Sequence, residues 1–267
     1  MSQAQSSSTA IPALRQLIDM ERLRQAFHTG TGKGVRIAVL DSGVDGTHPA
    51  FAGRVKAQYN VAMDRMGARC VPADITDSIG HGTACAGIIL QLAPEAELYS
   101  VQVIGKDSRG TTEQLIAALG FAIEQGYDVI NMSLGTTDER ITRRLGALTD
   151  KAFYNGQIIV AAANNFGDVA FPAHFSAVLS VSMEGFEEAE TIDYAMGKPI
   201  EVGARGVYVE APAMGGGTQL FTGTSFACPH VSGLVARLRS VYQDLTAFEA
   251  RSLLRLLAAG KKAASPA

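Results

Sequence analysis

The chain has 267 residues, of which 47% are hydrophobic and 18% charged, and 23 basic against 26 acidic side chains give a formal charge of −3. A chain of this length and composition can bury a large core within one domain. Its near-neutral charge gives no electrostatic reason to expect binding to nucleic acid or to a membrane surface. We therefore expect neither nucleic acid nor membrane among its partners.

The sequence also carries no sign of export. No apolar run approaches the roughly 18 residues that span a bilayer, and the first ten residues lack the basic and apolar parts of a secretory signal. Three cysteines without a C-x-x-C pair argue against a disulfide framework and against a zinc site. These features predict a reduced, cytoplasmic α/β enzyme or binding domain.

The chain is predicted to form one domain with short polar ends. Residues 1–10 are small and polar, and we expect a disordered tail there and a C-terminal tail over residues 261–267. Apolar residues recur at helical spacing from Ile11 to Phe27, and a glycine-rich break follows. Those glycines precede the first strong strand, whereas a dinucleotide-binding loop follows one, so dinucleotide binding is rejected. No repeat or linker divides residues 11–260, which predicts a single domain over that range.

Strand and helix patterns alternate along this domain. The predicted strands are residues 35–40, 98–103, 129–132, 158–162 and 178–182. The predicted helices are residues 81–92, 111–125, 139–154, 225–242 and 246–259, the last with Thr246 as its N-cap and Glu249 three residues on. Such alternation indicates right-handed crossovers between parallel strands. We predict an α/β fold of three layers, with a mostly parallel, twisted sheet and helices on both faces.

Three polar residues begin or end predicted elements where chemistry is possible. Asp41 follows the first strand, at the sheet edge that carries sites in parallel folds, although an Asp before Ser-Gly is also an ordinary turn residue. His81 opens a helix of small residues and could equally be a cap or a buried side chain. Ser225 starts another helix, where serine is normally a cap, but the positive helix end would also favour charge developing on a substrate oxygen.

The combination of these residues favours catalysis. A hydroxyl nucleophile needs a base to take its proton, and the base needs an acid to orient it and offset its charge. Along the chain these candidates follow the order acid, base, nucleophile: Asp41, His81 and Ser225. Each lies within a short glycine-bearing motif. The motifs are Asp41-Ser-Gly-Val-Asp45 with His48-Pro49, His81-Gly-Thr83, and Gly223-Thr-Ser225 continuing to Pro229-His230.

On these motifs the sequence resembles the subtilisin-like serine proteases from about residue 11 to residue 259. Further matching segments are residues 130–135 and 161–167. The resemblance implies a subtilisin-like fold and an intracellular-type serine endopeptidase that forms an acyl-enzyme. Ser225 would attack the scissile carbonyl, His81 would act as base and then acid, and Asp41 would orient His81.

The resemblance also implies an oxyanion donor at Asn165, acting with the backbone N–H of Ser225. The family has glycine before that asparagine, where this chain has Asn164, but Gly167 falls where the motif expects it and favours Asn165. Adjacent asparagines are also common turn residues, and that alternative stays open for both.

Two segments are implied to hold a substrate as an added strand between them. One is the wall formed by Ser133, Leu134 and Gly135, and the other is the opposing edge formed by Gly110, Thr111 and Thr112, although both threonines also suit a helix cap. The primary specificity pocket is expected along the wall and along Ala162, Ala163, Asn164 and Phe166, with Ala170 near its base. The resemblance also predicts a cis Phe171–Pro172 bond beside this pocket.

The side chains of this expected pocket set the predicted substrate preference. None of them is charged, so we expect Leu, Met, Phe or Tyr before the scissile bond. If Phe166 instead packs on the rim and Ala170 narrows the floor, smaller residues would be preferred.

The sequence departs from many subtilisins at their high-affinity calcium site. Gly87 is followed directly by apolar residues instead of an Asn/Asp-rich loop, and Ala50 replaces an acidic ligand. Calcium needs roughly six to eight oxygen ligands, so we expect no metal at this site and no cofactor. Only 40 residues precede Asp41, so we expect no prodomain. A propeptide supplied in trans and a protein inhibitor are candidate partners beside the peptide or protein substrate.

We considered three other interpretations of the sequence. The first, a dedicated processing protease for one precursor or leader peptide, would also be a serine protease. An inactive peptide-binding scaffold is disfavoured by the complete triad, and an α/β-hydrolase esterase is disfavoured because no G-x-S-x-G motif surrounds Ser225. Cys85 and Cys228 are expected to be small buried residues and not the nucleophile.

Overall fold

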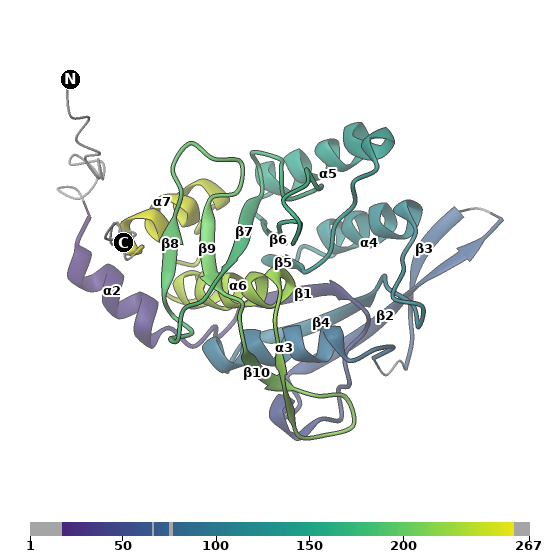
Figure 1. The fold of residues 1–267 in the computed structure, drawn as a ribbon, viewed down its shortest axis with the longest axis horizontal. Helices are drawn as coiled ribbons and strands as arrows, with labels where there is room; N and C mark the ends of the chain where they lie inside the picture. Colours follow the sequence, from purple (N-terminus) through teal and green to yellow (C-terminus); the bar gives the residue numbers. More distant parts are fainter. Residues whose placement is uncertain (1–17, 66, 75–76, 259–267) are drawn as a thin grey trace, which may run out of the picture.

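The computed structural model describes residues 18–65, 67–74 and 77–258 (Figure 1). The expected tails at residues 1–10 and 261–267 lie outside these ranges, as does the first part of the helical pattern that starts at Ile11. The described part of that pattern forms α2 (Met20–Thr29), whose first backbone N–H groups are capped by the Asp19 carboxylate.

A nine-stranded sheet forms the centre of the fold, in the order β3-β2-β4-β1-β5-β6-β7-β9-β8. Every neighbouring pair is parallel except at the two edges, where β3 and β8 run antiparallel to their neighbours. The strands are β1 (Arg36–Asp41), β2 (Val55–Asp64), β3 (Gly67–Pro72), β4 (Glu97–Gln102), β5 (Val129–Met132), β6 (Ile158–Ala162), β7 (Leu179–Glu184), β8 (Ile192–Tyr194) and β9 (Val202–Arg205). A separate hairpin pairs β10 (Val209–Pro212) with β11 (Thr218–Phe221).

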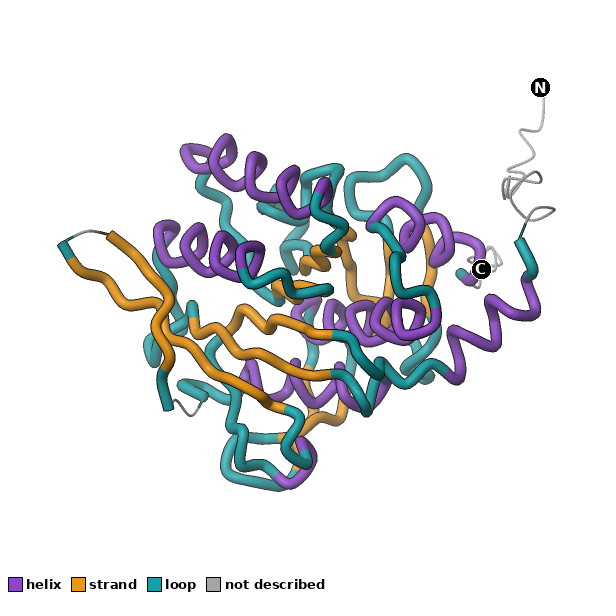
Figure 2. Tube along the Cα trace, turned by 180° about the vertical axis from the view of Figure 1, so that it is seen from behind, coloured by secondary structure: helices purple, strands orange, loops and turns teal. Residues whose placement is uncertain are grey.

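Helices cover both faces of the sheet (Figures 1 and 2). The helices that follow α2 are α3 (His81–Leu92), α4 (Thr112–Glu124), α5 (Thr142–Tyr154), α6 (Thr224–Val241) and α7 (Ala247–Leu257), with short 3₁₀ helices η1 (Pro49–Phe51) and η2 (Glu139–Ile141). Ile37 and Val39 of β1 pack in one core with α2, α3, α6 and α7, whereas Ala38 and Leu40 pack in another with α4 and α5. Side chains that alternate along β1 thus pack into two different cores, which explains why its interior residues 37–40 are all apolar.

The predicted α/β fold of three layers is confirmed, and several elements agree closely with the prediction. The predicted strands at 129–132 and 158–162 coincide with β5 and β6, and the predicted helix at 81–92 coincides with α3. Thr246 caps α7 as expected, since its hydroxyl accepts from the Glu249 N–H and the Glu249 carboxylate accepts from the Thr246 N–H. The predicted helix at 139–154 is divided into η2 and α5.

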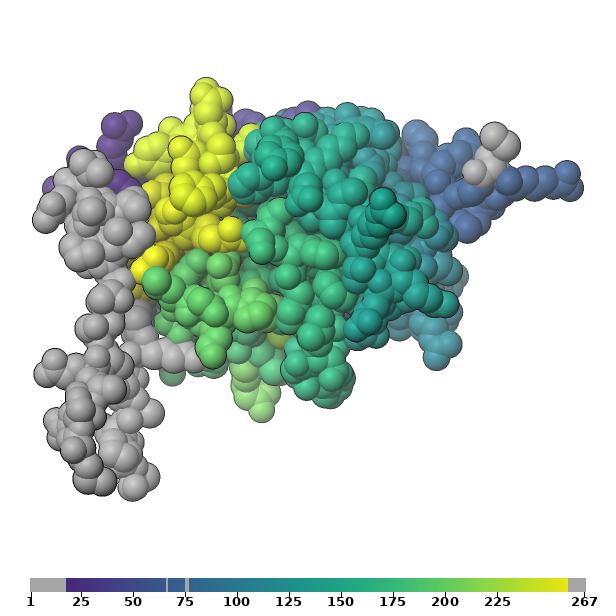
Figure 3. Space-filling view, turned by 90° about the horizontal axis from the view of Figure 1, so that it is seen from above, coloured from purple at the N-terminus to yellow at the C-terminus, as the bar shows by residue number. Residues whose placement is uncertain are grey.

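The β2–β3 hairpin, which projects at one end of the molecule, was not predicted from the sequence pattern (blue in Figures 1 and 3). The short strands β8 to β11 were not predicted either. None of the helices in the described ranges combines the length and apolar content that a membrane span requires.

Candidate active site

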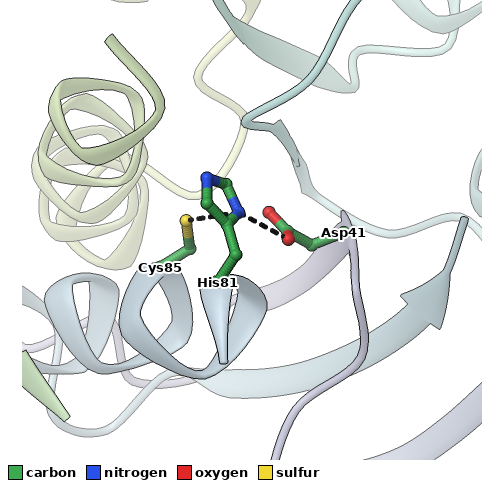
Figure 4. Close-up of side chains that lie close together, drawn as sticks. All are labelled: Asp41, His81 and Cys85. Carbon is green, nitrogen blue, oxygen red and sulfur yellow. Dashed lines mark hydrogen bonds and ion pairs between the residues drawn. The ribbon is translucent and has the colours of Figure 1, made fainter. Parts of the chain in front are cut away.

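Asp41 and His81 meet where the carboxyl end of β1 faces the first turn of α3. The Asp41 side chain is fully buried, and its Oδ1 accepts hydrogen bonds from His81 Nδ1 at 2.7 Å and from the Ser42 backbone N–H at 2.7 Å. Figure 4 shows one imidazole nitrogen between the Asp41 carboxylate and the Cys85 thiol, with the second nitrogen on the side of the ring turned away from Asp41. The arrangement fixes which ring nitrogen carries the proton and leaves the other free for a substrate or a nucleophile.

Close backbone packing explains the glycine after His81. A Cβ at Gly82 would lie 2.1 Å from the carbonyl oxygen of Gly43 and 3.1 Å from the Asp41 Cβ. Only a residue without a side chain lets the first turn of α3 approach the end of β1 this closely. The glycine of the His-Gly-Thr sequence is therefore required by packing.

The environment of His81 acts on its pKa in two directions. Burial has the largest single effect and lowers the pKa of His81 by disfavouring the charged ring, but the Asp41 carboxylate and the Cys85 side chain together raise it by more, so the pKa lies above its usual range. A fully buried carboxylate at this distance therefore stabilises an imidazolium. That is the electrostatic requirement for a histidine that must accept a proton during a reaction.

Ser225 lies half-buried in the first turn of α6. Its carbonyl oxygen accepts hydrogen bonds from Ser133 Oγ at 2.8 Å and from the Cys85 thiol at 3.4 Å, and that thiol sulfur lies 3.9 Å from His81 Nδ1. The ring of Phe226 lies 5.0 Å from the His81 ring, centroid to centroid. No hydrogen bond joins the Ser225 hydroxyl to His81 among the contacts of the described residues. Such bonds are often long in free enzymes and shorten when substrate binds.

Thr224 ties the start of α6 to the segment after β6. Its backbone N–H donates to Asn165 Oδ1 at 2.9 Å, and its hydroxyl donates to the Ala163 carbonyl at 2.6 Å. Because the Asn165 oxygen is engaged in this way, its NH₂ group is the part of the amide left to donate to a ligand. That group lies at the same helix terminus as the Ser225 N–H, where the helix dipole also favours negative charge.

The two adjacent asparagines make different contacts. Asn164 Oδ1 accepts from the Phe166 backbone N–H at 2.8 Å, which is the local turn bond typical of asparagine. Asn164 therefore has the turn role that the sequence left open for both asparagines. Asn165 instead lies against the turn of α6 that carries Ser225.

A hollow of about 440 Å³ opens beside Ser225. It is lined by Ser133, Leu134, Gly135, Thr136, Thr137, Ala162, Ala163, Asn164, Asn165, Phe166, Ala170, Thr224 and Ser225. The structure thus brings together all eight residues expected along the primary pocket, and none of the lining residues is charged. The sequence analysis missed Thr136 and Thr137, although they directly follow the expected wall.

The rim and floor of this hollow differ in exposure. Phe166 is 90% exposed, so its ring stands on the rim and leaves the interior open, whereas Ala170 is 5% exposed and lies against Gly135. The Phe171–Pro172 bond is cis, as predicted. Phe171 also exchanges two backbone hydrogen bonds of 2.8 Å with Thr136, which fixes one side of the hollow.

A second hollow of about 330 Å³ lies between the two segments expected to flank a substrate. Gly110, Thr111 and Thr112 line one side of it, and Leu134 and Gly135 line the other. Thr111 also caps α4, because its hydroxyl accepts from the Gln114 N–H at 3.2 Å. A larger hollow of about 520 Å³ lies over α7 and includes none of these residues.

Asp41, His81 and Cys85 are also the one group in the described ranges whose ligand atoms are close enough to hold a metal, within 4.8 Å of one another. Burial raises the pKa of the Cys85 thiol, and the Asp41 charge raises it further. A metal binds the thiolate, and His81 Nδ1 already donates to Asp41. The chemistry of this trio therefore fits acid–base function better than metal binding.

Comparison with known proteins identifies the family. Residues 32–266 match the model of the Subtilase family. The chain belongs to the subtilase family. It is 33% identical over 242 residues to Subtilisin E of Bacillus subtilis (strain 168), an alignment that covers 84% of this chain and 60% of that protein. It is 30% identical over 250 residues to an intracellular serine protease of Paenibacillus polymyxa, covering 86% and 75% respectively.

Two solved structures share this fold. Sphericase superposes with a TM-score of 0.74 at 27% identity, covering 87% of both chains. A cold-adapted subtilisin-like serine proteinase superposes with a TM-score of 0.73 at 26% identity, covering 89% of this chain and 86% of the other. The chain spans about 60% of the length of Subtilisin NAT and Subtilisin E.

Proposed function

We propose that the chain is a serine endopeptidase in which Ser225 is the nucleophile, His81 the general base and Asp41 the acid that orients it. The observation that carries this proposal is the 2.7 Å hydrogen bond from His81 to the buried Asp41, beside the helix turn that holds Ser225. Membership of the subtilase family supports the same chemistry.

The proposed reaction proceeds in two halves. His81 Nε2 takes the proton of Ser225 Oγ as that oxygen attacks the scissile carbonyl carbon, and Asp41 stabilises the imidazolium that forms. His81 then gives the proton to the leaving amine, and an acyl-enzyme remains on Ser225. Water, deprotonated by the same histidine, hydrolyses the ester and restores the serine.

The developing oxyanion would accept hydrogen bonds from the Asn165 NH₂ group and from the Ser225 backbone N–H. Support comes from the bond between Thr224 N–H and Asn165 Oδ1, which leaves the NH₂ group as the available donor. Such a donor contributes about 10²–10³-fold to kcat when it faces the oxyanion and not the ground-state carbonyl.

We further propose that the enzyme prefers Leu, Met, Phe or Tyr before the scissile bond. The hollow beside Ser225 has a volume of about 440 Å³ and no charged lining residue. Phe166 stands on its rim, as the alternative that favours smaller residues assumes, but the volume still leaves room for a large apolar side chain. Burying a large apolar side chain contributes roughly 1.5–3 kcal/mol, whereas burying an unpaired charge is costly.

This preference is tested by incubating the protein with a proteome-derived peptide library and reading the cleavage sites by mass spectrometry. We expect most cleavages to follow Leu, Met, Phe or Tyr. Dominant cleavage after Lys, Arg, Asp or Glu would contradict the apolar pocket, and dominant cleavage after Ala or Gly would show that Ala170 narrows it. Cleavage of a single sequence only would favour a dedicated processing protease.

We also propose activity without the high-affinity calcium site of many subtilisins. α3 runs without an inserted loop from Gly87 to Leu92, and Ala50 in η1 offers no side-chain oxygen. EGTA is therefore expected to change the melting temperature little. A large decrease that calcium restores would contradict this proposal.

The proposed setting is the cytoplasm, supported by the printed name of the Paenibacillus relative, an intracellular serine protease. The proposed partners are peptide or protein substrates, together with a protein inhibitor or a propeptide supplied in trans.

A further inference from the structure

Asp77 is a buried carboxylate outside the triad, with 4% of its surface exposed. Its Oδ1 accepts from the Ser42 hydroxyl at 2.6 Å and from the Ile79 backbone N–H at 3.1 Å. Its Oδ2 accepts from the Thr83 backbone N–H at 2.7 Å and from the Thr83 hydroxyl at 2.6 Å. Both oxygens therefore act only as acceptors, as an ionised carboxylate does.

These contacts connect the two segments that carry the triad acid and base. Ser42 directly follows Asp41, and Thr83 lies two residues after His81. The Ser42 hydroxyl, which donates to Asp77, also accepts from the Gly82 backbone N–H at 3.0 Å. One carboxylate thus holds the end of β1 and the first turn of α3 in a single hydrogen-bonded unit.

The same unit replaces a missing helix cap. The N-cap position of α3 is Gly80, which has no side chain to accept the first N–H groups of the helix. The first N–H groups of a helix have no carbonyl partner within it. Here the Ser42 hydroxyl accepts from the Gly82 N–H and the Asp77 carboxylate accepts from the Thr83 N–H, so two of these groups are satisfied from outside the helix. A carboxylate at this end also interacts favourably with the helix dipole.

We propose that Asp77 is a positioning residue for the triad, acting through Ser42 and the first turn of α3 to hold the His81 ring against Asp41. The inference rests on the proposed function, because it assigns to Asp77 the geometry that proton transfer requires. A displacement of about 1 Å in a reacting group can cost about 10²-fold in rate.

Asparagine cannot substitute for this carboxylate. Each oxygen of Asp77 accepts from a backbone N–H, Ile79 on one side and Thr83 on the other. Either orientation of an asparagine amide would therefore place its NH₂ group against a backbone donor. The Asp77→Asn variant should lose contacts on one side and let the turn of α3 move.

Asp45, in the loop that follows β1, provides a matched control. It is a buried aspartate with 7% exposure, and its carboxylate accepts from the Thr47 N–H and hydroxyl and from the Gly215 N–H. None of these partners lies in α3 or next to Asp41 in sequence. The Asp45 backbone N–H donates to the Thr83 hydroxyl at 3.0 Å, but this bond does not involve the carboxylate and remains in the variant. Asp45→Asn therefore repeats the chemical change and the loss of carboxylate hydrogen bonds without removing a contact of the α3 turn.

The test compares Asp77→Asn with Asp45→Asn in melting temperature, in kcat and KM on a peptide substrate, and in the low-field proton resonance of the His81–Asp41 hydrogen bond. Both variants are expected to melt at lower temperature. Asp77→Asn is expected to lose roughly 10²-fold in kcat with KM within about twofold, and to lose or shift the low-field proton. Asp45→Asn is expected to keep both kcat, within about threefold, and the resonance.

Equal kcat values and equal resonances in the two variants would show that Asp77 is only structural and would overturn the proposal. If Asp77→Asn does not fold, Ser42→Ala removes the link next to Asp41 while the carboxylate remains. That variant is expected to lose about tenfold in kcat and to shift the low-field proton, and wild-type values of both would overturn the proposal. The resonance reports positioning even in a protein without peptidase activity, whereas wild-type turnover tests the proposed function separately.

Discussion

Replacing Ser225 with alanine is expected to lower kcat by about 10⁶-fold, the scale of loss when a subtilisin nucleophile is removed. The substitution removes only the attacking hydroxyl. The backbone contacts of Ser225 with Ser133 and Cys85 use its carbonyl oxygen, so they remain. KM and the melting temperature should therefore stay close to those of the unchanged protein. The measurement is steady-state hydrolysis of a peptide substrate together with a thermal melt.

Ser240→Ala is the matched control, because Ser240 lies in the same helix and its hydroxyl bonds only to the Arg237 carbonyl. This variant should retain wild-type turnover. A Ser225→Ala protein that keeps more than about one hundredth of the wild-type kcat would contradict the assignment of the nucleophile.

Asp41→Asn is expected to lower kcat by about 10⁴-fold and to move the acid limb of the pH profile. The Asp41 carboxylate raises the pKa of His81, and asparagine carries no charge, so the pKa of His81 should fall in the variant. His81 accepts a proton only when neutral, so activity is lost as pH falls through its pKa. The remaining activity of the variant should therefore persist to lower pH than that of the wild type. The measurement is kcat/KM as a function of pH.

Asp45→Asn serves again as the control, because the Asp45 carboxylate makes no contact with His81. Its acid limb should coincide with that of the wild type. An acid limb of Asp41→Asn that is unchanged or lies at higher pH would show that Asp41 does not set the protonation of His81.

The fold was predictable from sequence where strands are buried on both faces. β5 and β6 are short, wholly buried and mostly apolar runs, and their predicted limits were correct. β2 is half-exposed along most of its length and has no clean alternation, so its pattern did not indicate a strand. β8 to β11 contain only three or four residues each, too few for a period to be recognised.

Local motifs predicted the candidate triad, because Asp41, His81 and Ser225 each begin or end an element beside glycine. The long-range hydrogen bonds of Asp77 left no comparable motif in the sequence. Asp77 lies 35 residues from Ser42 in the chain and belongs to none of the recognised motifs. The packing of α3 against the end of β1 brings the Asp77 carboxylate into contact with Ser42 and Thr83, which are close in sequence to Asp41 and His81.

The most direct test of Ser225 as the nucleophile is covalent labelling with a fluorophosphonate, followed by mass spectrometry of the labelled peptide. We expect one modified residue, Ser225, in the wild-type protein. Labelling should be lost in Ser225→Ala and strongly slowed in His81→Ala. Absence of labelling in folded wild-type protein, or modification of another residue that persists in Ser225→Ala, would contradict the proposal that this chain is a serine peptidase acting through Ser225.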